Sequence, residues 1–146
     1  MPVDAVMLIK TPGKVDEKRL AALSERLYRD FGPKAFGNYD GGEDPLTPLR
    51  AEYDPPDGTY DNWLNLHVEG AVYEPGYERA DPWRYIALAE WIEFNLPGAR
   101  VFYGNDRNDD QRPFDEKARR AVIEHFCRHG HDPYRYRRSR PKQVER

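Results

Sequence analysis

The stretch that decides the fold is Asn62–Glu69, with the sequence N-W-L-N-L-H-V-E. Aliphatic residues occupy every second position, namely Leu64, Leu66 and Val68. The positions between and around them carry an indole, an amide, an imidazole and a carboxylate, namely Trp63, Asn65, His67 and Glu69. Strict alternation predicts a strand with one face in a core and one face free of it. The free face is rich in functional groups, which makes it one of several candidates for a binding site.

The flanking sequence predicts an α+β domain around this strand. Val3–Thr11 is apolar at successive positions, which is typical of a central strand, and Ala99–Tyr103 is the last predicted strand. A short strand is expected at Leu49–Tyr53 and another at Ala71–Tyr73, after a bend at Gly70. The predicted helices are Asp16–Phe31, Asp81–Leu96 and Asp115–His129. This order predicts a ferredoxin-like (split βαβ) antiparallel sheet with an added C-terminal helix.

In that topology the first two helices cover the face that carries Leu64, Leu66 and Val68, and the third helix could cover part of the other face. Two segments, Gly32–Pro48 and Gly104–Pro113, are predicted to be loops. Residues 1–134 are expected to form one domain, and Arg135–Arg146 a basic, disordered tail.

Composition limits the class of protein. The 146 residues are 38% hydrophobic and 13% aromatic, which favours a folded chain over a disordered one. The single cysteine, Cys127, allows no internal disulfide, and no apolar run is long enough for a signal peptide or a membrane span. We therefore expect a cytoplasmic protein without a membrane partner, and the excess of Arg over Lys suggests a bacterial or phage source. No cofactor is expected.

The second helix carries two apolar stripes. One of them includes the large residues Trp83, Trp91 and Phe94. If a partner protein or a second copy of the chain covers this stripe, these residues form an interface, since Trp and Phe are enriched at interface centres. The alternative is that a loop or the C-terminal segment of the same chain covers it.

A histidine pair at i and i+4 ends the third helix. His125 and His129 lie on its apolar stripe, and His131 and Asp132 follow. The spacing matches that of zinc ligands, but Phe126 occupies the position of the Glu base in zinc peptidases. Structural histidines in the last helical turn are the simpler interpretation.

The free face of Asn62–Glu69 has two interpretations. As a platform of Trp63, Asn65 and His67 it would stack and hydrogen-bond a ligand, as in readers of single-stranded RNA, although the glycine–aromatic motif of those readers is absent. Alternatively, the third helix lies across it and buries Trp63. In that case His67, Glu69, His125 and His129 would converge and become candidate catalytic residues.

Charge is distributed unevenly. The tail carries six basic residues and one acidic residue, so that the rest of the chain has a net charge of −8 within the total of −3. An acidic body disfavours nonspecific binding to nucleic acid, whereas Arg135–Arg146 could contact phosphates. Asn38–Asp61 holds seven carboxylates against Arg50 and would attract a basic partner.

These patterns favour a small non-enzymatic binding or regulatory protein that acts through protein–protein contacts, using the Trp83/Trp91/Phe94 stripe or the acidic region. The first alternative is a small His-based or metal-dependent hydrolase that uses His67, Glu69, His125 and His129. The second is a nucleic-acid binder that acts through the basic tail.

Overall fold

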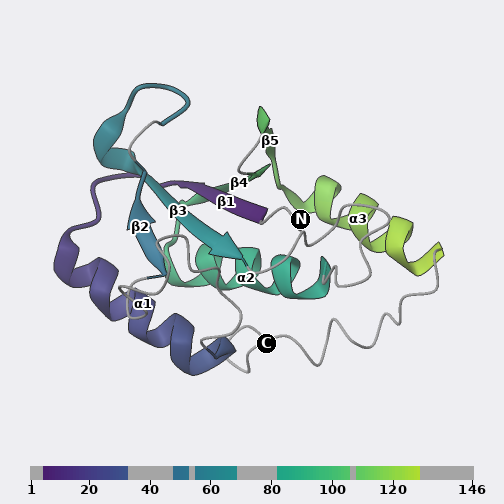
Figure 1. Ribbon diagram of the computed structural model, residues 1–146, viewed down its shortest axis with the longest axis horizontal. Coiled ribbons are helices and arrows are strands. Elements are labelled where there is room, and N and C mark those ends of the chain that lie inside the picture. Colours follow the sequence, from purple (N-terminus) through teal and green to yellow (C-terminus); the bar gives the residue numbers. More distant parts are fainter. Residues whose placement is uncertain (1–4, 33–47, 53–54, 69–81, 106–107, 129–146) are drawn as a thin grey trace.

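A computed structural model describes residues 5–32, 48–52, 55–68, 82–105 and 108–128. They form an α+β structure with a five-stranded antiparallel sheet and three α-helices (Figure 1). The strands are β1 (Ala5–Lys10), β2 (Leu49–Ala51), β3 (Trp63–Val68), β4 (Arg100–Asn105) and β5 (Asn108–Pro113). The helices are α1 (Glu17–Phe31), α2 (Pro82–Asn95) and α3 (Glu116–Arg128), and a 3-10 turn, η2 (Tyr60–Asn62), precedes β3.

β1 lies at the centre of the sheet, whose strand order is β2-β3-β1-β4-β5. It pairs antiparallel with β3 on one side and with β4 on the other, so that Met7 faces Leu66 across one pair and Tyr103 across the other. Directly opposite residues point to the same face of a sheet. The register therefore gathers Met7 and Ile9 of β1, Leu64 and Leu66 of β3, and Val101 of β4 on one face, as the alternation of β3 predicts.

That face packs against α1 and α2, which lie on the same side of the sheet (Figure 1). The core contains Leu23 and Leu27 of α1, Ile86 and Ile92 of α2, and Leu66 of β3, all of them buried. The prediction that two helices cover Leu64 and Leu66 is confirmed. We call this the helix face of the sheet, and the opposite one the open face.

The ends of the helices follow the local sequence signals. The Asp16 carboxylate accepts a hydrogen bond from the backbone N–H of Arg19 at 2.8 Å, which caps α1. Gly32 ends this helix with a φ of 83°, a left-handed value that glycine adopts without steric cost. Asp115 likewise caps α3 by accepting from the N–H of Ala118 at 2.9 Å. All three boundaries agree with the sequence prediction.

The position of α3 differs from one of the two interpretations given to the free face of Asn62–Glu69. Its residues Ala118, Val122 and Ile123 pack against the core on the helix face, and Arg119 forms an ion pair with Glu93 of α2. α3 therefore lies beside α2 and not across the open face. The reason is that its apolar stripe continues the core beyond α2. There Phe114 packs edge-on against the buried ring of Tyr85, with ring centroids 5.0 Å apart.

β5 corrects a second expectation, because the sequence predicts a loop over Gly104–Pro113. Residues 108–113 instead pair with β4, with Pro113 opposite Phe102 and an irregularity in register between Tyr103 and Asn105. The sequence N-D-D-Q-R-P has no apolar alternation, so no pattern predicts a strand there. Backbone pairing with β4 forms it regardless of side-chain pattern, as is common at the edge of a sheet.

Four elements predicted from the sequence lie outside the described residues. These are most of the long Gly32–Pro48 loop, the bend at Gly70, the strand at Ala71–Tyr73 and the tail Arg135–Arg146. Within the described part of the chain, none of the helices combines the length and the apolar character that crossing a membrane requires.

The two faces of β3 should differ sharply in their contribution to stability. We expect Leu66→Ala, at a fully buried site, to lower the free energy of unfolding by about 3–5 kcal/mol because it leaves a cavity between sheet and helices. Asn65→Ala removes one part-buried hydrogen bond to Glu52 and should cost no more than about 2 kcal/mol. Urea denaturation of both variants measures the difference, and equal costs would contradict the assignment of the two faces.

Candidate functional site

The open face carries the side chains that alternate with the core residues. Lys10 of β1 lies opposite Trp63 of β3 and opposite Arg100 of β4. One row further along, Leu8 lies between Asn65 and Phe102. Two cations and two aromatic rings thus occupy neighbouring positions on three adjacent strands.

Trp63 is buried, with only 3% of its surface exposed, although α3 does not cover it. The segment of residues 55–62, which connects β2 to β3, lies against it instead. From this segment, Asp57 accepts a hydrogen bond from the Trp63 indole Nε1–H at 2.7 Å. On the β4 side the indole packs against Phe102, with ring centroids 5.3 Å apart and planes tilted by 50°.

Asp57 is one of the residues that join the 55–62 segment to the sheet. Besides the indole, its carboxylate accepts from the Lys10 ammonium at 2.7 Å and from the Thr59 hydroxyl and backbone N–H at 2.6 and 3.0 Å. The Lys10 ammonium, and after it Thr59, hold the pKa of the Asp57 carboxyl far below its ordinary range. Asp57 is therefore ionised in the folded protein throughout the neutral and mildly acidic range.

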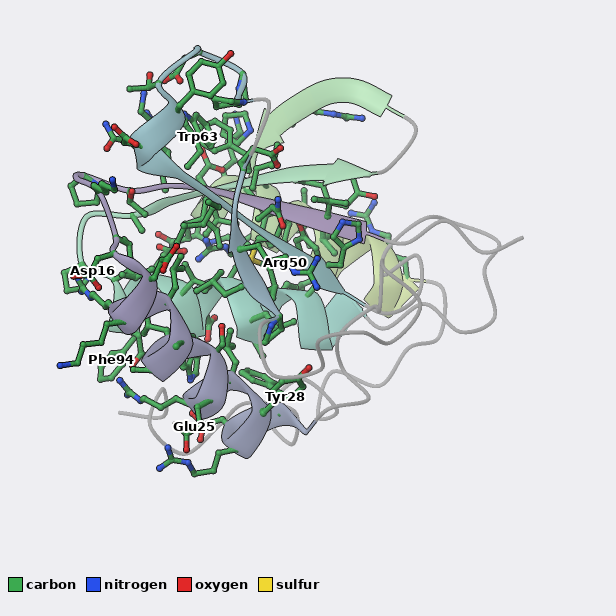
Figure 2. All side chains as sticks on the ribbon, turned by 60° about the vertical axis from the view of Figure 1, so that its left-hand side comes forward. Asp16, Glu25, Tyr28, Arg50, Trp63 and Phe94 are labelled. Atoms are coloured by element: carbon green, nitrogen blue, oxygen red, sulfur yellow. The ribbon has the colours of Figure 1, made fainter. Side chains whose placement is uncertain are left out.

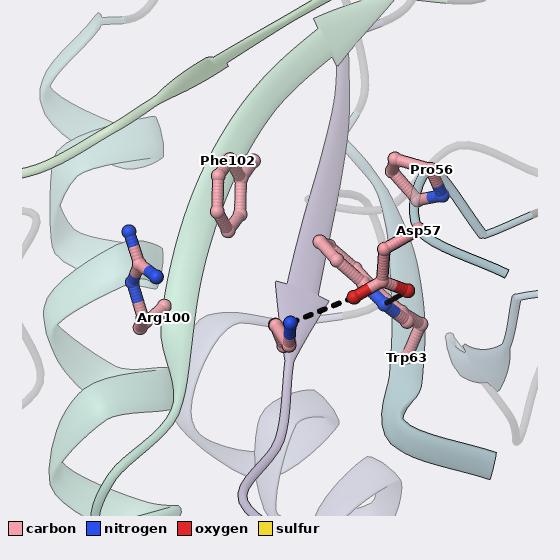
Figure 3. A pocket seen from close by; sticks show the side chains of 6 residues that line it. Pro56, Asp57, Trp63, Arg100 and Phe102 are labelled. Atoms are coloured by element: carbon pink, nitrogen blue, oxygen red, sulfur yellow. Dashed lines mark hydrogen bonds and ion pairs between the residues drawn. The ribbon is translucent and has the colours of Figure 1, made fainter. Parts of the chain in front are cut away.

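A hollow of about 250 Å³ opens next to these groups (Figure 3). We call it the sheet hollow; it is lined by Lys10, Pro56, Asp57, Trp63, Arg100 and Phe102. Figure 3 shows Arg100 and Phe102 on one side of β1, and Pro56, Asp57 and Trp63 on the other. The Arg100 guanidinium carbon is 5.3 Å from the centroid of the Phe102 ring, within the range of a cation–π contact.

The predicted platform of Trp63, Asn65 and His67 does lie on the open face, but it is not a stacking surface. The Trp63 ring is enclosed, and the Asn65 amide donates to the Glu52 carboxylate at 3.1 Å. His67 lies opposite Val6 and is half-buried. What this strand offers to a ligand is therefore one wall of the sheet hollow.

The predicted cluster of catalytic residues depends on α3 crossing the open face, where His67 lies. Among the described residues that condition is not met, because α3 packs on the helix face. Glu69 and His129 lie outside the described residues, and so does the side chain of His125 in α3. His67 is the one member of this set whose side chain can be placed.

The weak metal candidates His129, His131 and Asp132 also lie outside the described residues, as does the side chain of His125. Within the described ranges, no group of three or more His, Cys, Asp or Glu side chains is arranged to hold a metal ion. The metal-dependent alternative therefore gains no support from the residues that the structure describes.

The predicted interface stripe on α2 is divided between core and surface. Trp91 is fully buried: its indole N–H donates to Asp30 of α1 at 2.7 Å, and Arg26 of α1 lies 5.8 Å from its ring. α1 is thus a cover for this stripe. Phe94 is 39% exposed, and Figure 2 shows it on the opposite side of the sheet from Trp63. The side chain of Trp83 lies outside the described part.

Sequence reasoning singled out Trp63 but missed the other aromatic and cationic residues of the sheet hollow. Arg100 and Phe102 alternate with Val101 and Tyr103, so their common face could have been read from the sequence. Lys10 and Asp57 are 47 residues apart, and no local pattern indicates that they pair. Asp57 was counted only as one carboxylate of the acidic region.

Comparison of the chain with protein-family models, with curated proteins and with solved structures finds no match in any of the three. The function therefore has to be argued from the geometry of the open face.

Replacement of Asp57 should release the 55–62 segment from the sheet. We expect Asp57→Asn to lower the melting temperature near neutral pH, because an amide cannot form an ion pair with Lys10. The folded state lowers the pKa of Asp57, so its stabilising effect is complete above the unfolded value and is lost as the pH falls. The difference between wild type and variant should therefore narrow below about pH 4.

The matched control is Asp61→Asn. Asp61 pairs with Lys14 at 3.9 Å, but the two side chains are 74% and 70% exposed, and such a surface ion pair contributes little to stability. Thermal denaturation of the three proteins from neutral to acidic pH measures the effect. A constant difference between wild type and Asp57→Asn over this range would contradict the role given to the carboxylate.

Proposed function

We propose that the protein is a non-enzymatic binding protein that contacts a protein partner through the open face of its sheet. The observation that carries this proposal is the sheet hollow, where Trp63, Phe102, Lys10 and Arg100 meet on one face while the described helices pack on the other. Aromatic residues and arginine are the residue types enriched at the energetic centres of protein interfaces.

The arrangement of the open face suits binding better than catalysis. Asp57 holds its charge and is bonded to Lys10, Thr59 and Trp63, which makes it a structural carboxylate and a poor general base. Phe102 and Arg100 present a ring face and a guanidinium group side by side. These groups hold a partner in place but supply no nucleophile and no proton-transfer group.

The proposed fold behind this surface is a ferredoxin-like domain within residues 1–134, to which β5 and α3 are additions. The order β2-β3-β1-β4 and its antiparallel pairing support this topology. So does the sequence of elements, in which α1 connects β1 to β2 and α2 connects β3 to β4.

A library of displayed random peptides, selected on the immobilised wild-type protein, tests the proposed function. We expect enriched peptides to bind Arg100→Glu and Phe102→Ala at least about tenfold more weakly than wild type, because both substitutions change the sheet hollow. Arg19→Glu, an equal charge change at an exposed position of α1, should leave binding unchanged.

Phe94→Ala serves as the second control, since it removes an exposed ring from the other side of the molecule. Peptides that lose affinity for Phe94→Ala but not for Arg100→Glu would move the interface to α2 and contradict the proposal. A library that yields no enriched peptide would count against it as well. Thermal denaturation of each variant shows whether Phe102→Ala is folded, and Arg100→Glu changes a surface group alone.

A further inference from the structure

The size of the sheet hollow limits what it can bind. Its volume of about 250 Å³ lies below the roughly 300–1,000 Å³ of pockets that enclose a small-molecule ligand. It has room for one ring-sized group, while the rest of the ligand must remain outside. An aromatic side chain projecting from a protein partner has these properties, and such anchors in small pockets dominate the affinity of many interfaces.

The walls of the hollow favour an aromatic group. Phe102 is half-buried and presents part of its ring to the hollow, with the Trp63 indole tilted beside it at 5.3 Å. Pro56 lies on the opposite side (Figure 3). A ring entering between them can adopt the edge-to-face or offset geometry that aromatic pairs prefer.

The charges around the hollow favour a carboxylate next to that ring. Lys10 is paired with Asp57 at 2.7 Å, so these two charges largely compensate each other. Arg100 is exposed, and among the described residues its one assigned contact is with the Phe102 ring. Its planar guanidinium can hold a carboxylate through two parallel hydrogen bonds. The lining therefore carries a net charge of about +1, located at Arg100.

We propose that the partner inserts one aromatic side chain into the sheet hollow and places an adjacent carboxylate against Arg100. The ligand class is therefore a peptide segment in which Phe, Tyr or Trp is followed by Asp or Glu. This inference rests on the proposed protein-binding function and specifies the partner of the same site.

A single-stranded nucleic acid would also offer a ring and an anion, but the charge of the chain argues against it. The chain has a net charge of −3, and the part that precedes Arg135 has −8. Binding to a polyanion depends on several phosphate contacts by cations, and in the sheet hollow Lys10 is already paired with Asp57, which leaves Arg100 for such a contact. A peptide with one carboxylate beside one ring therefore matches the sheet hollow better than a nucleic acid does.

Titration of the full-length ¹⁵N-labelled protein with capped tetrapeptides, followed by NMR, tests this inference. The probes are acetyl-Gly-Phe-Glu-Gly-amide, the same peptide with Lys for Glu, and the same peptide with Ala for Phe. We expect the Phe–Glu peptide to shift the indole N–H resonance of Trp63 and the backbone resonance of Phe102, with a dissociation constant on the order of 1 mM. The other two peptides should bind at least about fivefold more weakly.

Arg100→Glu should reverse the preference, so that the Phe–Lys peptide becomes the tighter ligand, whereas Arg19→Glu should keep the wild-type order. This reversal separates a specific contact from a loss of folding, because a misfolded variant would bind neither peptide. Equal shifts with the Phe–Glu and Phe–Lys peptides, or no shift with either, would overturn the inference. Binding of an oligothymidylate at the same resonances, without binding of the Phe–Glu peptide, would replace it with nucleic-acid recognition.

The two proposals can fail separately. If peptides selected from the library lose affinity for Arg100→Glu but contain no aromatic–acidic pair, the open face is still the interface and only the partner chemistry is wrong. If the selected peptides bind Arg100→Glu and Phe102→Ala as tightly as the wild type, the binding function assigned to the open face fails, and this inference fails with it.

Discussion

The antiparallel register of β1 is the constraint on which the rest of the structure depends. Because β1 is paired on both sides, the position of each of its residues determines which side chains of β3 and β4 share a face. The pairing of Met7 and Ile9 places Leu64, Leu66 and Val101 on the helix face. The pairing of Leu8 and Lys10 places Trp63, Arg100 and Phe102 on the open face. A shift of one residue would exchange the two faces. Core packing and the composition of the open face are thus two results of one alignment.

The position of the 55–62 segment depends strongly on polar contacts. One carboxylate, that of Asp57, binds an ammonium, an indole, a hydroxyl and a backbone N–H. Charge-assisted hydrogen bonds are stronger and more directional than neutral ones, so they fix the orientation of the indole as well as its burial. The shape of the sheet hollow therefore depends on this carboxylate as much as on the aromatic rings.

Much of the fold could be predicted from the sequence because its signals are local. The alternation around Leu64 and Leu66, the cap at Asp16 and the glycine stop at Gly32 each depend on residues within one element. The strand at residues 108–113 could not, since its pairing with β4 leaves no mark in its side-chain pattern. The position of α3 stayed open between the two faces, because an amphipathic stripe shows that a helix packs but not which face of a sheet receives it.

The candidate site was predictable in part for the same reason. Alternation identified the face that carries Trp63, but it could not indicate which group would cover the indole. Asp57 lies six residues from Trp63 and 47 from Lys10, and these contacts depend on how a connection folds back over the sheet. Likewise Trp91 is bonded to Asp30, 61 residues away, so a stripe that suggested an interface is partly a contact between two helices.

The two edge strands have a consequence for assembly. β2 has three residues, and β5 combines charged side chains in its sequence with Pro113, which has no N–H to donate. Short, charged or proline-containing edges are poor templates for adding a further strand, so they oppose edge-to-edge polymerisation and amyloid-like growth. The two edges within the described part of the chain therefore disfavour the association of copies of this sheet through their edge strands.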